Sequence, residues 1–301
     1  MSWQAGLVSA LARRVLRPGL ARRVDVARMR RRFERAVALF QRPAPMSLVL
    51  QGVAGGPGLW VTNRPTEAGV ILYFHGGAYV MGSAQSHAAL ASHIARRTGL
   101  RVFLPDYALA PEHPFPAAFL NALAAFEALV HQGHDPRRIL LGGDSAGGGL
   151  ALALLGHLCR EGRPPAGLFA FSPWTDLTFS GASLVTNAAR DLLLPAHRMT
   201  EIRAMILGGA RPGEADDPRL SPLHATFPGA PPVQIHVAET EILRDDALRM
   251  RHRLPDAEIR LAGNLPHVWP FLHGWLPEAD ETLDQTAAFI RSCLPPASGE
   301  S

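Results

Sequence analysis

Lysine is absent from this chain of 301 residues, so all 30 of its basic residues are arginines. Such a bias suits a GC-rich genome better than any particular function. Cysteine is scarce as well, because Cys159 and Cys293 are the only two and lie far apart in the sequence. They favour buried thiols in a reducing compartment, which we take to be the cytoplasm. No apolar run approaches the roughly 18 residues of a membrane-spanning helix, so no membrane span is expected.

Patterns typical of metal and nucleotide sites are also missing. The sequence contains neither H-E-x-x-H nor C-x-x-C, and its glycine-rich turn lacks the Gly-Lys-Ser/Thr of a phosphate-binding loop. We therefore expect no metal and no cofactor. What is present is a chain that is 47% hydrophobic, with a length that suits one large α/β domain with insertions, since roughly 200–300 residues is common for that class.

The segment Gly143-Asp144-Ser145-Ala146-Gly147 has the pattern of a nucleophile elbow. A serine on such a sharp turn needs small residues two positions before and after it, because the strand and the helix nearly touch there. The setting fits, since an apolar run precedes the motif and helical spacing continues from Leu150 to Leu158. We predict that Ser145 is the nucleophile. The neighbouring Asp144 is interpreted as a hydrogen-bond acceptor that stabilises the elbow.

A second glycine-rich segment, residues 73–79 with the letters YFHGGAY, follows another apolar run. Attack on an ester creates an oxyanion, and each preorganised backbone N–H donor stabilises it by roughly 3–4 kcal/mol. Consecutive glycines allow such donors to turn inward because no Cβ stands in the way. We predict that the N–H groups of Gly76 and Gly77 form the oxyanion hole together with that of Ala146, the residue after the nucleophile.

These two motifs and the stretch DYALAPEHPFPA at residues 106–117 resemble the hormone-sensitive-lipase-like branch of the α/β-hydrolases, the bacterial family IV type. The resemblance runs from about residue 73 to the C-terminal helix, and more loosely into the N-terminal arm. It implies that His75 has a structural role and that Glu112 supports the loop that carries the oxyanion hole.

The chain departs from the family pattern at two positions. Ala78 stands where the family usually has a third glycine, and Ala108 stands where it usually has arginine. We expect the methyl group of Ala78 to lie near the acyl pocket. It would then alter the size of acyl group that the pocket tolerates without removing the two main N–H donors.

Strand-like and helix-like runs alternate along the body of the chain. After a hairpin of Ser47–Val53 and Leu59–Thr62, we predict strands near 69–74, 101–105, 138–142, 168–172, 232–238 and 257–262, with helices near 85–97, 115–132, 145–161, 245–253 and 278–293. This alternation is typical of a mostly parallel sheet with helices on both faces. Because residues 174–232 carry no strand signal and long structureless loops are uncommon, we predict an insertion at about 176–225 with a helical segment around 186–210.

A serine nucleophile needs a base and an acid, which follow it in this fold in the order Ser, acid, His. The acid should come just after the strand at 233–237, where Glu239, Glu241 and Asp245 are candidates. By resemblance to the family motif E-x-L-x-x-D, the acid is Glu241. Glu239 is its nearest rival and Asp245 the next, and either of these can equally be a surface charge or a helix N-cap.

The base should follow the last strand. The loop Gly263-Asn264-Leu265-Pro266-His267-Val268-Trp269 resembles the histidine loop of the family, and His267 alone among 13 histidines combines this loop with the right chain order. We predict that its Nε2 takes the proton of Ser145, while Glu241 holds the other ring nitrogen.

Eleven of the arginines fall within the first 42 residues, against only Asp25 and Glu34, so the rest of the chain is mildly acidic. Apolar residues recur there at helical spacing in two stretches separated by Pro18-Gly19, namely Trp3, Leu7, Leu11 and Val15, then Val26, Met29, Phe33 and Val37.

Three interpretations of this arm compete: a transit peptide, an amphipathic helix on a membrane surface, and a pair of helices that cover the active site. We favour the third, which matches the use of such an arm in the family. Residues 1–45 and the insertion then form a helical cap on a catalytic domain of residues 46–301. Nucleic-acid binding is disfavoured because the arginines alternate with apolar residues.

The function implied is hydrolysis of short- to medium-chain carboxylic esters through an acyl-enzyme, with a small-molecule ester as the partner. The same groups are compatible with lactone, carbamate or amide hydrolysis. A non-catalytic ligand receptor on this fold is disfavoured because His267 is present. The last strand of such a sheet is an exposed edge, so a homodimer through it is also compatible with the sequence.

Overall fold

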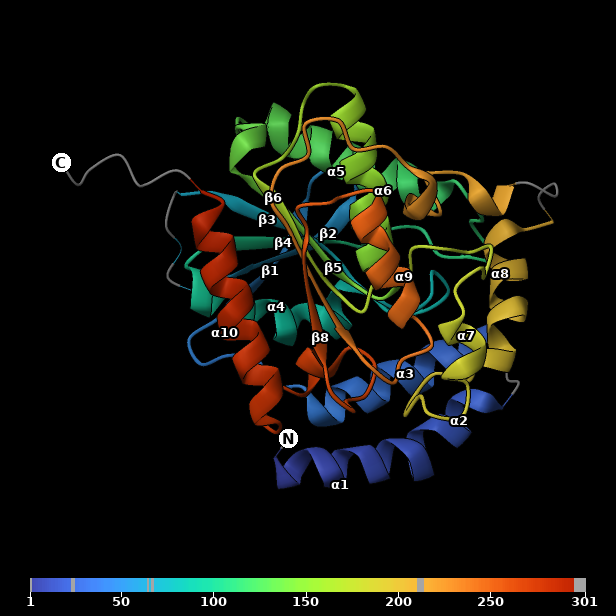
Figure 1. Cartoon of the computed structure of the whole chain (residues 1–301). Helices are drawn as coiled ribbons and strands as arrows, with labels where there is room; N and C mark the ends of the chain where they lie inside the picture. Colours follow the sequence, from blue (N-terminus) through green and yellow to red (C-terminus); the bar gives the residue numbers. More distant parts are fainter. Residues whose placement is uncertain (1, 23–24, 64, 66–67, 210–213, 295–301) are drawn as a thin grey trace.

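The computed structural model describes residues 2–22, 25–63, 65, 68–209 and 214–294 (Figure 1). Its centre is an eight-stranded sheet in the order β1-β2-β4-β3-β5-β6-β7-β8. The β1–β2 and β2–β4 pairs are antiparallel, and all other neighbours are parallel. The strands are β1 (Leu48–Val53), β2 (Pro57–Thr62), β3 (Val70–Phe74), β4 (Arg101–Pro105), β5 (Ile139–Asp144), β6 (Gly167–Phe171), β7 (Val233–Ala238) and β8 (Glu258–Ala262). The predicted alternation and the mostly parallel sheet are confirmed.

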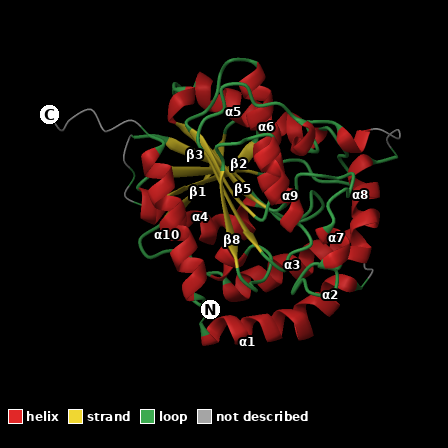
Figure 2. Ribbon diagram, viewed as in Figure 1, coloured by secondary structure: helices red, strands yellow, loops and turns green. Residues whose placement is uncertain are grey.

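Helices cover both faces of the sheet (Figure 2). Their bounds are α4 (Ala84–Thr98), α5 (Ala117–His131), α6 (Ala146–Arg160), α9 (Arg244–Arg249) and α10 (Pro277–Ser292). Successive strand residues point to opposite faces, so Tyr73 packs with α4 and α10 while Leu72 and Phe74 pack with α5 and α6. Because both faces are covered, β3, β5, β6 and β7 are buried throughout.

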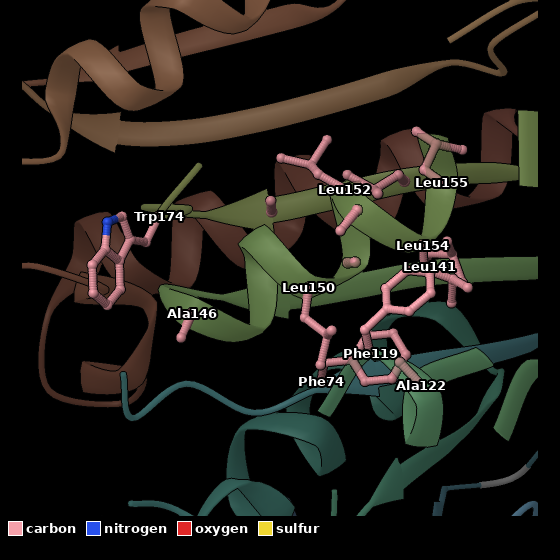
Figure 3. Close-up of a cluster of buried hydrophobic side chains, with 14 of the residues drawn as sticks. Phe74, Phe119, Ala122, Leu141, Ala146, Leu150, Leu152, Leu154, Leu155 and Trp174 are labelled. Carbon is pink, nitrogen blue, oxygen red and sulfur yellow. The ribbon is translucent and has the colours of Figure 1, made fainter. Parts of the chain in front are cut away.

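Helix α6 runs through the largest of the hydrophobic clusters. Figure 3 shows Leu150 and Leu154 of this helix beside Phe74 of β3, Leu141 of β5 and Phe119 of α5. Burying one such side chain stabilises the fold by about 1.5–3 kcal/mol. The packing of α6 along its length therefore fixes the end of the helix that carries the elbow motif.

The N-terminal arm is helical as predicted, but its break lies elsewhere. Helix α1 (Trp3–Leu11), a π-helical turn (Ala12–Leu16) and α2 (Arg17–Ala21) form one continuous stretch that runs through Pro18 and Gly19. Proline is tolerated there because it occupies the first turn of α2, where its missing N–H is not required. The chain then becomes extended at Arg22, and α3 (Val26–Phe40) begins after the N-cap Asp25, whose carboxylate accepts the N–H of Arg28.

The first apolar stripe of the arm does not pack on the body of the protein, although a helix that forms part of a cap is expected to bury its apolar face there. Trp3, Leu7 and Leu11 face outward, and the side of α1 that meets the body presents Ala5, which is fully buried. Helical spacing marks two faces without saying which one packs. Small residues allow the closer approach, so the alanine face is the one buried. The second stripe has the expected orientation, since Met29 packs on the largest hydrophobic cluster and Phe33 stacks on His87.

The insertion contains shorter helices than predicted. Helix α7 (Ser183–Thr186) and α8 (Met199–Leu207) occur at the expected helical segment of 186–210, of which residue 210 lies outside the described residues. Between them the Asp191 carboxylate accepts the N–H groups of Leu193 and Leu194, and Pro195 follows. A side chain that captures the backbone in this way competes with helix formation. The predicted helical segment is therefore present in part, as α8 and shorter turns, and is interrupted at Asp191.

The arm and the insertion lie against each other (Figure 1). Arg13 and Arg17 donate to the backbone carbonyls of Arg190 and Ala188, and Arg198 donates in return to the carbonyl of Leu20. These contacts are those that a two-part cap requires. The division at residue 45 and the limits of the insertion stay predictions.

Candidate active site

Ser145 occupies the turn between β5 and α6 in a conformation that L-residues rarely adopt, with φ of 53° and ψ of −122°. Its own N–H donates to the carbonyl of Phe171 on the neighbouring strand at 2.8 Å. The flanking glycines are required by contact, since a Cβ on Gly143 would lie 2.4 Å from the oxygen of Gly147, and one on Gly147 would lie 2.1 Å from the oxygen of Phe74. The turn thus lifts the serine hydroxyl off the end of the sheet.

Three side chains from separate loops meet at this turn. His267 Nε2 lies 2.8 Å from Ser145 Oγ, and His267 Nδ1 lies 2.6 Å from Glu241 Oε2. Glu241 follows β7 and His267 follows β8, so both come from the same edge of the sheet as the serine. The structure does not bring the rival acids here, because Glu239 is exposed and Asp245 accepts the N–H of Ser183 instead.

Glu241 is held by groups that sequence reasoning missed. Its second oxygen, Oε1, accepts the hydroxyl of Ser172 at 2.8 Å and the N–H of Ala238 at 2.7 Å. The Ser172 hydroxyl also accepts the N–H of Val268, directly after His267. Ser172 therefore ties the loop of the acid to the loop of the histidine. No motif marks it, and the only available signal is its position at the end of β6.

A second buried carboxylate, Asp191 of the insertion, stands beside this group. It is fully buried, and its Oδ2 accepts the N–H of Ile242 at 2.8 Å. Burial and the nearby charge of Glu241 raise the pKa of Asp191 above its ordinary value. Asn187 adds to the link by donating to the carbonyl of Glu241 at 2.8 Å. The insertion is thus fastened directly to the loop of the acid.

The protonation of His267 is set by opposing effects. Burial lowers its pKa, but the charge and hydrogen bond of Glu241 and the charges of Asp191 and Asp144 raise it by more. The net result is a pKa above the ordinary value of 6.5. His267 is therefore more basic than a free imidazole, as a proton acceptor for a serine should be.

The glycine loop after β3 departs from the prediction at Gly76. Its N–H donates to Asp144 Oδ1 at 3.1 Å, so it is committed to a structural hydrogen bond and is not available to an oxyanion. In contrast, the N–H groups of Gly77, Ala78 and Ala146 have no acceptor among the described residues. The geometry therefore argues against Gly76 as an oxyanion donor and puts Ala78 in its place.

Asp144 connects the elbow to this loop. Besides the N–H of Gly76, its Oδ1 accepts the hydroxyl of Tyr73 at 2.9 Å and lies 3.4 Å from His87 Nε2. Burial raises the pKa of Asp144, but the charge and hydrogen bonds of His87 and the hydroxyl of Tyr73 outweigh it, so the pKa lies below its ordinary value. Its carboxylate does not contact Ser145 Oγ in the hydrogen-bond network of the described residues. Asp144 is a structural acceptor.

His75 is buried behind the loop. Its ring Nδ1–H donates to the carbonyl of Gly76 at 2.8 Å, and the ring stacks on Tyr107 with centroids 4.2 Å apart. The hydroxyl of Tyr107 donates to the carbonyl of His75 at 2.7 Å. Burial and the neighbouring His87 lower the pKa of His75 to about 3, so its ring is neutral at physiological pH.

Glu112 acts on the loop only through another residue. Its exposed carboxylate pairs with Arg30 of α3 at 2.7 Å, and Arg30 donates to the carbonyls of Val80 and Ala110. The direct support of the loop therefore comes from the arm.

Elsewhere, no group of three or more potential metal ligands occurs within the described ranges, and no described helix is long and apolar enough to cross a membrane.

Comparisons with known proteins agree with this site. A family model described as an alpha/beta hydrolase fold matches residues 71–270. An acetyl-hydrolase of Streptomyces hygroscopicus is 38% identical over 238 residues, which cover 77% of this chain and 79% of the relative. An esterase of Acinetobacter venetianus is 36% identical over 246 residues, which cover 80% of each.

Solved structures give the same result over nearly the whole chain. An esterase from the bacterial hormone-sensitive lipase (HSL) family superposes with a TM-score of 0.89 at 36% identity, covering 97% of this chain and 98% of that one. A hormone-sensitive lipase from a metagenome library superposes with a TM-score of 0.87 at 30% identity, covering 96% of each. Fold and site together define a hydrolase of the α/β class. The chain belongs to the α/β-hydrolase family, in the branch of the hormone-sensitive-lipase-like bacterial esterases.

Proposed function

We propose that this protein hydrolyses short- to medium-chain carboxylic esters through an acyl-enzyme formed on Ser145. Its family makes it a carboxylic ester hydrolase, and the residue roles are our proposal. The observation that carries them is the connected pair of contacts at 2.8 Å from Ser145 Oγ to His267 Nε2 and at 2.6 Å from His267 Nδ1 to Glu241. A nucleophile, a base and a group that orients the base are thereby in hydrogen-bond reach of one another.

The chemistry proceeds in two halves. His267 Nε2 accepts the proton of Ser145 as Oγ attacks the ester carbonyl, and the imidazolium then protonates the departing alcohol. Water, deprotonated by the same nitrogen, attacks the acyl-enzyme and releases the carboxylic acid. Throughout, the Nδ1–H of His267 donates to Glu241, whose negative charge stabilises the imidazolium.

The oxyanion that forms in each half is assigned to the free backbone donors. These are the N–H groups of Gly77, Ala78 and Ala146, of which Ala146 stands at the first position of α6. An anion at the start of a helix is also favoured by the helix dipole. The revised set keeps two of the donors predicted from the sequence and replaces Gly76 by Ala78.

The preference for modest acyl groups rests on the resemblance to the family and on the small space found next to the start of α6. A cleft beside α6 is lined by Tyr79, Phe119, Leu150 and Ile206. Leu150 stands one helical turn beyond Ala146, so this space lies about one turn of α6 away from the elbow. The insertion contributes Ile206, and with the arm it forms the proposed cap that limits the length of the chain.

Two further proposals come from the sequence. The protein is cytoplasmic, and it forms a homodimer through β8, which lies at one edge of the sheet. Strand edges present unpaired backbone groups that a second copy can complete. Light scattering of the purified protein measures the oligomeric state, and a monomer at micromolar concentration would contradict the dimer.

A fluorophosphonate probe tests the proposed mechanism, because it reacts only with an activated serine. Wild type should be labelled at Ser145 and should hydrolyse p-nitrophenyl butyrate. Ser145→Ala should lose both properties and keep its fold, while the control Ser292→Ala, at an exposed position on α10, should keep both. An unlabelled wild type would indicate a ligand receptor, and labelling without ester turnover would point to a lactone, carbamate or amide as substrate.

A further inference from the structure

The outer face of α1 and of the π-helical turn that continues it carries a row of large apolar side chains, which we call the outer stripe: Trp3, Leu7, Leu11 and Val15. Their exposed fractions are 74%, 62%, 48% and 58%. Figure 1 shows α1 at the margin of the molecule, away from the sheet. Single exposed apolar residues are ordinary on protein surfaces, but a continuous patch marks a site of interaction. Here the residues recur on successive helical turns, so they form one strip.

The opposite face of the same helix explains why the stripe points outward. Ala5 is fully buried and belongs to the cluster that contains Trp269 and Leu276, and Ala12 is 2% exposed. These small side chains allow the helix backbone to lie close to the body. Turning the helix to bury the stripe would lose this close contact. The stripe is therefore a stable feature of the folded protein.

The charge carried by the helical stretch itself is of one sign. From Trp3 to Arg22 the chain contains no acidic residue, while Arg13, Arg14 and Arg22 are exposed. Arg13 and Arg17 donate to backbone carbonyls, which leaves their charges uncompensated. Further exposed arginines lie on the neighbouring α3, namely Arg28, Arg31, Arg32 and Arg35, and none of the four forms an ion pair with a described residue.

We propose that the outer stripe and the arginines beside it bind the surface of a bilayer that contains anionic phospholipid. A helix with an apolar strip and basic flanks lies in the plane of such a surface, with its apolar side chains among the acyl chains and its arginines on the phosphates. The consequence for the substrate rests on the proposed function: an esterase bound to a membrane encounters the apolar esters that partition into that membrane.

Charge decides against a second copy of this chain as the occupant. A symmetric dimer places the same patch of both copies face to face. Exposed arginines such as Arg13 and Arg14 would then oppose each other across the interface without acidic partners, and like charges placed together disfavour association. An anionic surface satisfies both the apolar stripe and the arginines.

Co-sedimentation of the full-length protein with large unilamellar vesicles tests this surface. Wild type should bind vesicles of phosphatidylcholine with 30% phosphatidylglycerol and bind pure phosphatidylcholine at least tenfold more weakly. The variant Trp3→Gln/Leu7→Gln/Leu11→Gln should lose binding by tenfold or more. Arg13→Gln/Arg14→Gln should lose roughly 25-fold, at about fivefold for each arginine near an anionic surface, and raised salt should weaken wild-type binding.

A matched control replaces exposed apolar residues elsewhere, as Leu120→Gln/Val185→Gln/Val53→Gln, and should bind vesicles like wild type. The stripe variant should retain the wild-type kcat/KM for p-nitrophenyl butyrate without vesicles, which shows that it is folded. Binding by Ser145→Ala separates this proposal from the catalytic one, because docking does not need turnover.

Three results would overturn the proposal. The first is the absence of wild-type binding to the anionic vesicles. The second is equal binding by wild type and the stripe variant. The third is a wild-type dimer in light scattering that the stripe variant converts to a monomer, which would identify a second copy as the occupant of the stripe.

Discussion

Around Ser145 the polar groups have buried partners, whereas the described part of the arm, residues 2–22 and 25–42, contributes only Ala5 and Ala12 as buried residues. Glu241 accepts three hydrogen bonds, two of them from the separate loops of Ser172 and His267, and Asp144 links the elbow to the glycine loop. The arm instead holds the body by guanidinium groups that reach backbone carbonyls. Reacting groups must keep one geometry, so they are fixed from several sides. A covering segment needs only to stay in place.

The two regions should therefore respond differently to change. A conservative substitution inside the network should abolish activity and leave stability nearly intact. A substitution on the outer face of the arm should alter neither the fold nor the turnover of small esters. Four experiments sharpen or break this contrast.

The largest effect is expected for Glu241→Gln. The amide keeps the size of the side chain but offers no negative acceptor to the imidazolium, and a comparable change in a serine protease lowers kcat by roughly 10⁴-fold. Glu239→Gln is the matched control, since this exposed carboxylate stands two residues away and should cost less than about threefold. Steady-state kinetics on p-nitrophenyl butyrate decides, and equal losses in both variants would contradict the role of Glu241.

Deletion of residues 1–42 comes next. It removes Arg30, which holds the carbonyls of Val80 and Ala110, and Glu34, which accepts the hydroxyl of Ser83 at 3.0 Å. It also exposes the ring of His87 by removing Phe33. We expect aggregation or a loss of at least about 100-fold in kcat/KM, because a displacement of the glycine loop by an ångström can cost that much. A soluble protein with wild-type kinetics would instead favour a transit peptide.

Order along the chain and local motifs were enough to predict which residues meet. Ser145, Glu241 and His267 lie in reach of one another because each follows the end of a strand of the same sheet, and the parallel strands bring those ends to one edge. The glycines of the elbow could also be predicted, because the requirement for them is local: a Cβ at either position would collide with a nearby backbone atom.

The features of the site that could not be predicted depend on contacts between residues that are far apart in the sequence. Gly76 and Gly77 look equivalent in the sequence, and only the position of Asp144, 68 residues later, commits one of the two N–H groups. Ser172 carries no motif, since its value lies in contacts with two other loops. Which face of α1 packs on the body could not be predicted, because the burial of Ala5 depends on a cluster formed by residues beyond position 230.

Asp191→Asn should have a moderate effect with a diagnostic pH dependence. An amide nitrogen facing the N–H of Ile242 loses one hydrogen bond, at about 1–1.5 kcal/mol, or roughly tenfold in kcat. Activity requires neutral His267, so kcat/KM falls as pH drops through its raised pKa. Asp191 is one of the charges that raise this pKa, so its removal should move the acid limb of the profile to lower pH. A limb that stays in place would show that Asp191 acts through packing alone.

Ala78→Gly should have the smallest effect. Ala78 has a φ of 55°, where a Cβ costs roughly 1 kcal/mol that glycine avoids. The gain is offset by about 0.4–1 kcal/mol because glycine makes the unfolded chain more flexible. The free energy of unfolding in urea should thus change by less than about 0.6 kcal/mol. The control Ala204→Gly, at an exposed position inside α8, lacks the strain relief and should destabilise by about 0.5–1 kcal/mol. Since the N–H of residue 78 is kept, kcat on p-nitrophenyl butyrate should stay within about threefold of wild type, and longer acyl esters should gain more than butyrate. If both variants destabilise equally, the backbone of the glycine loop holds no strain, and the site would differ less from the arm than we infer.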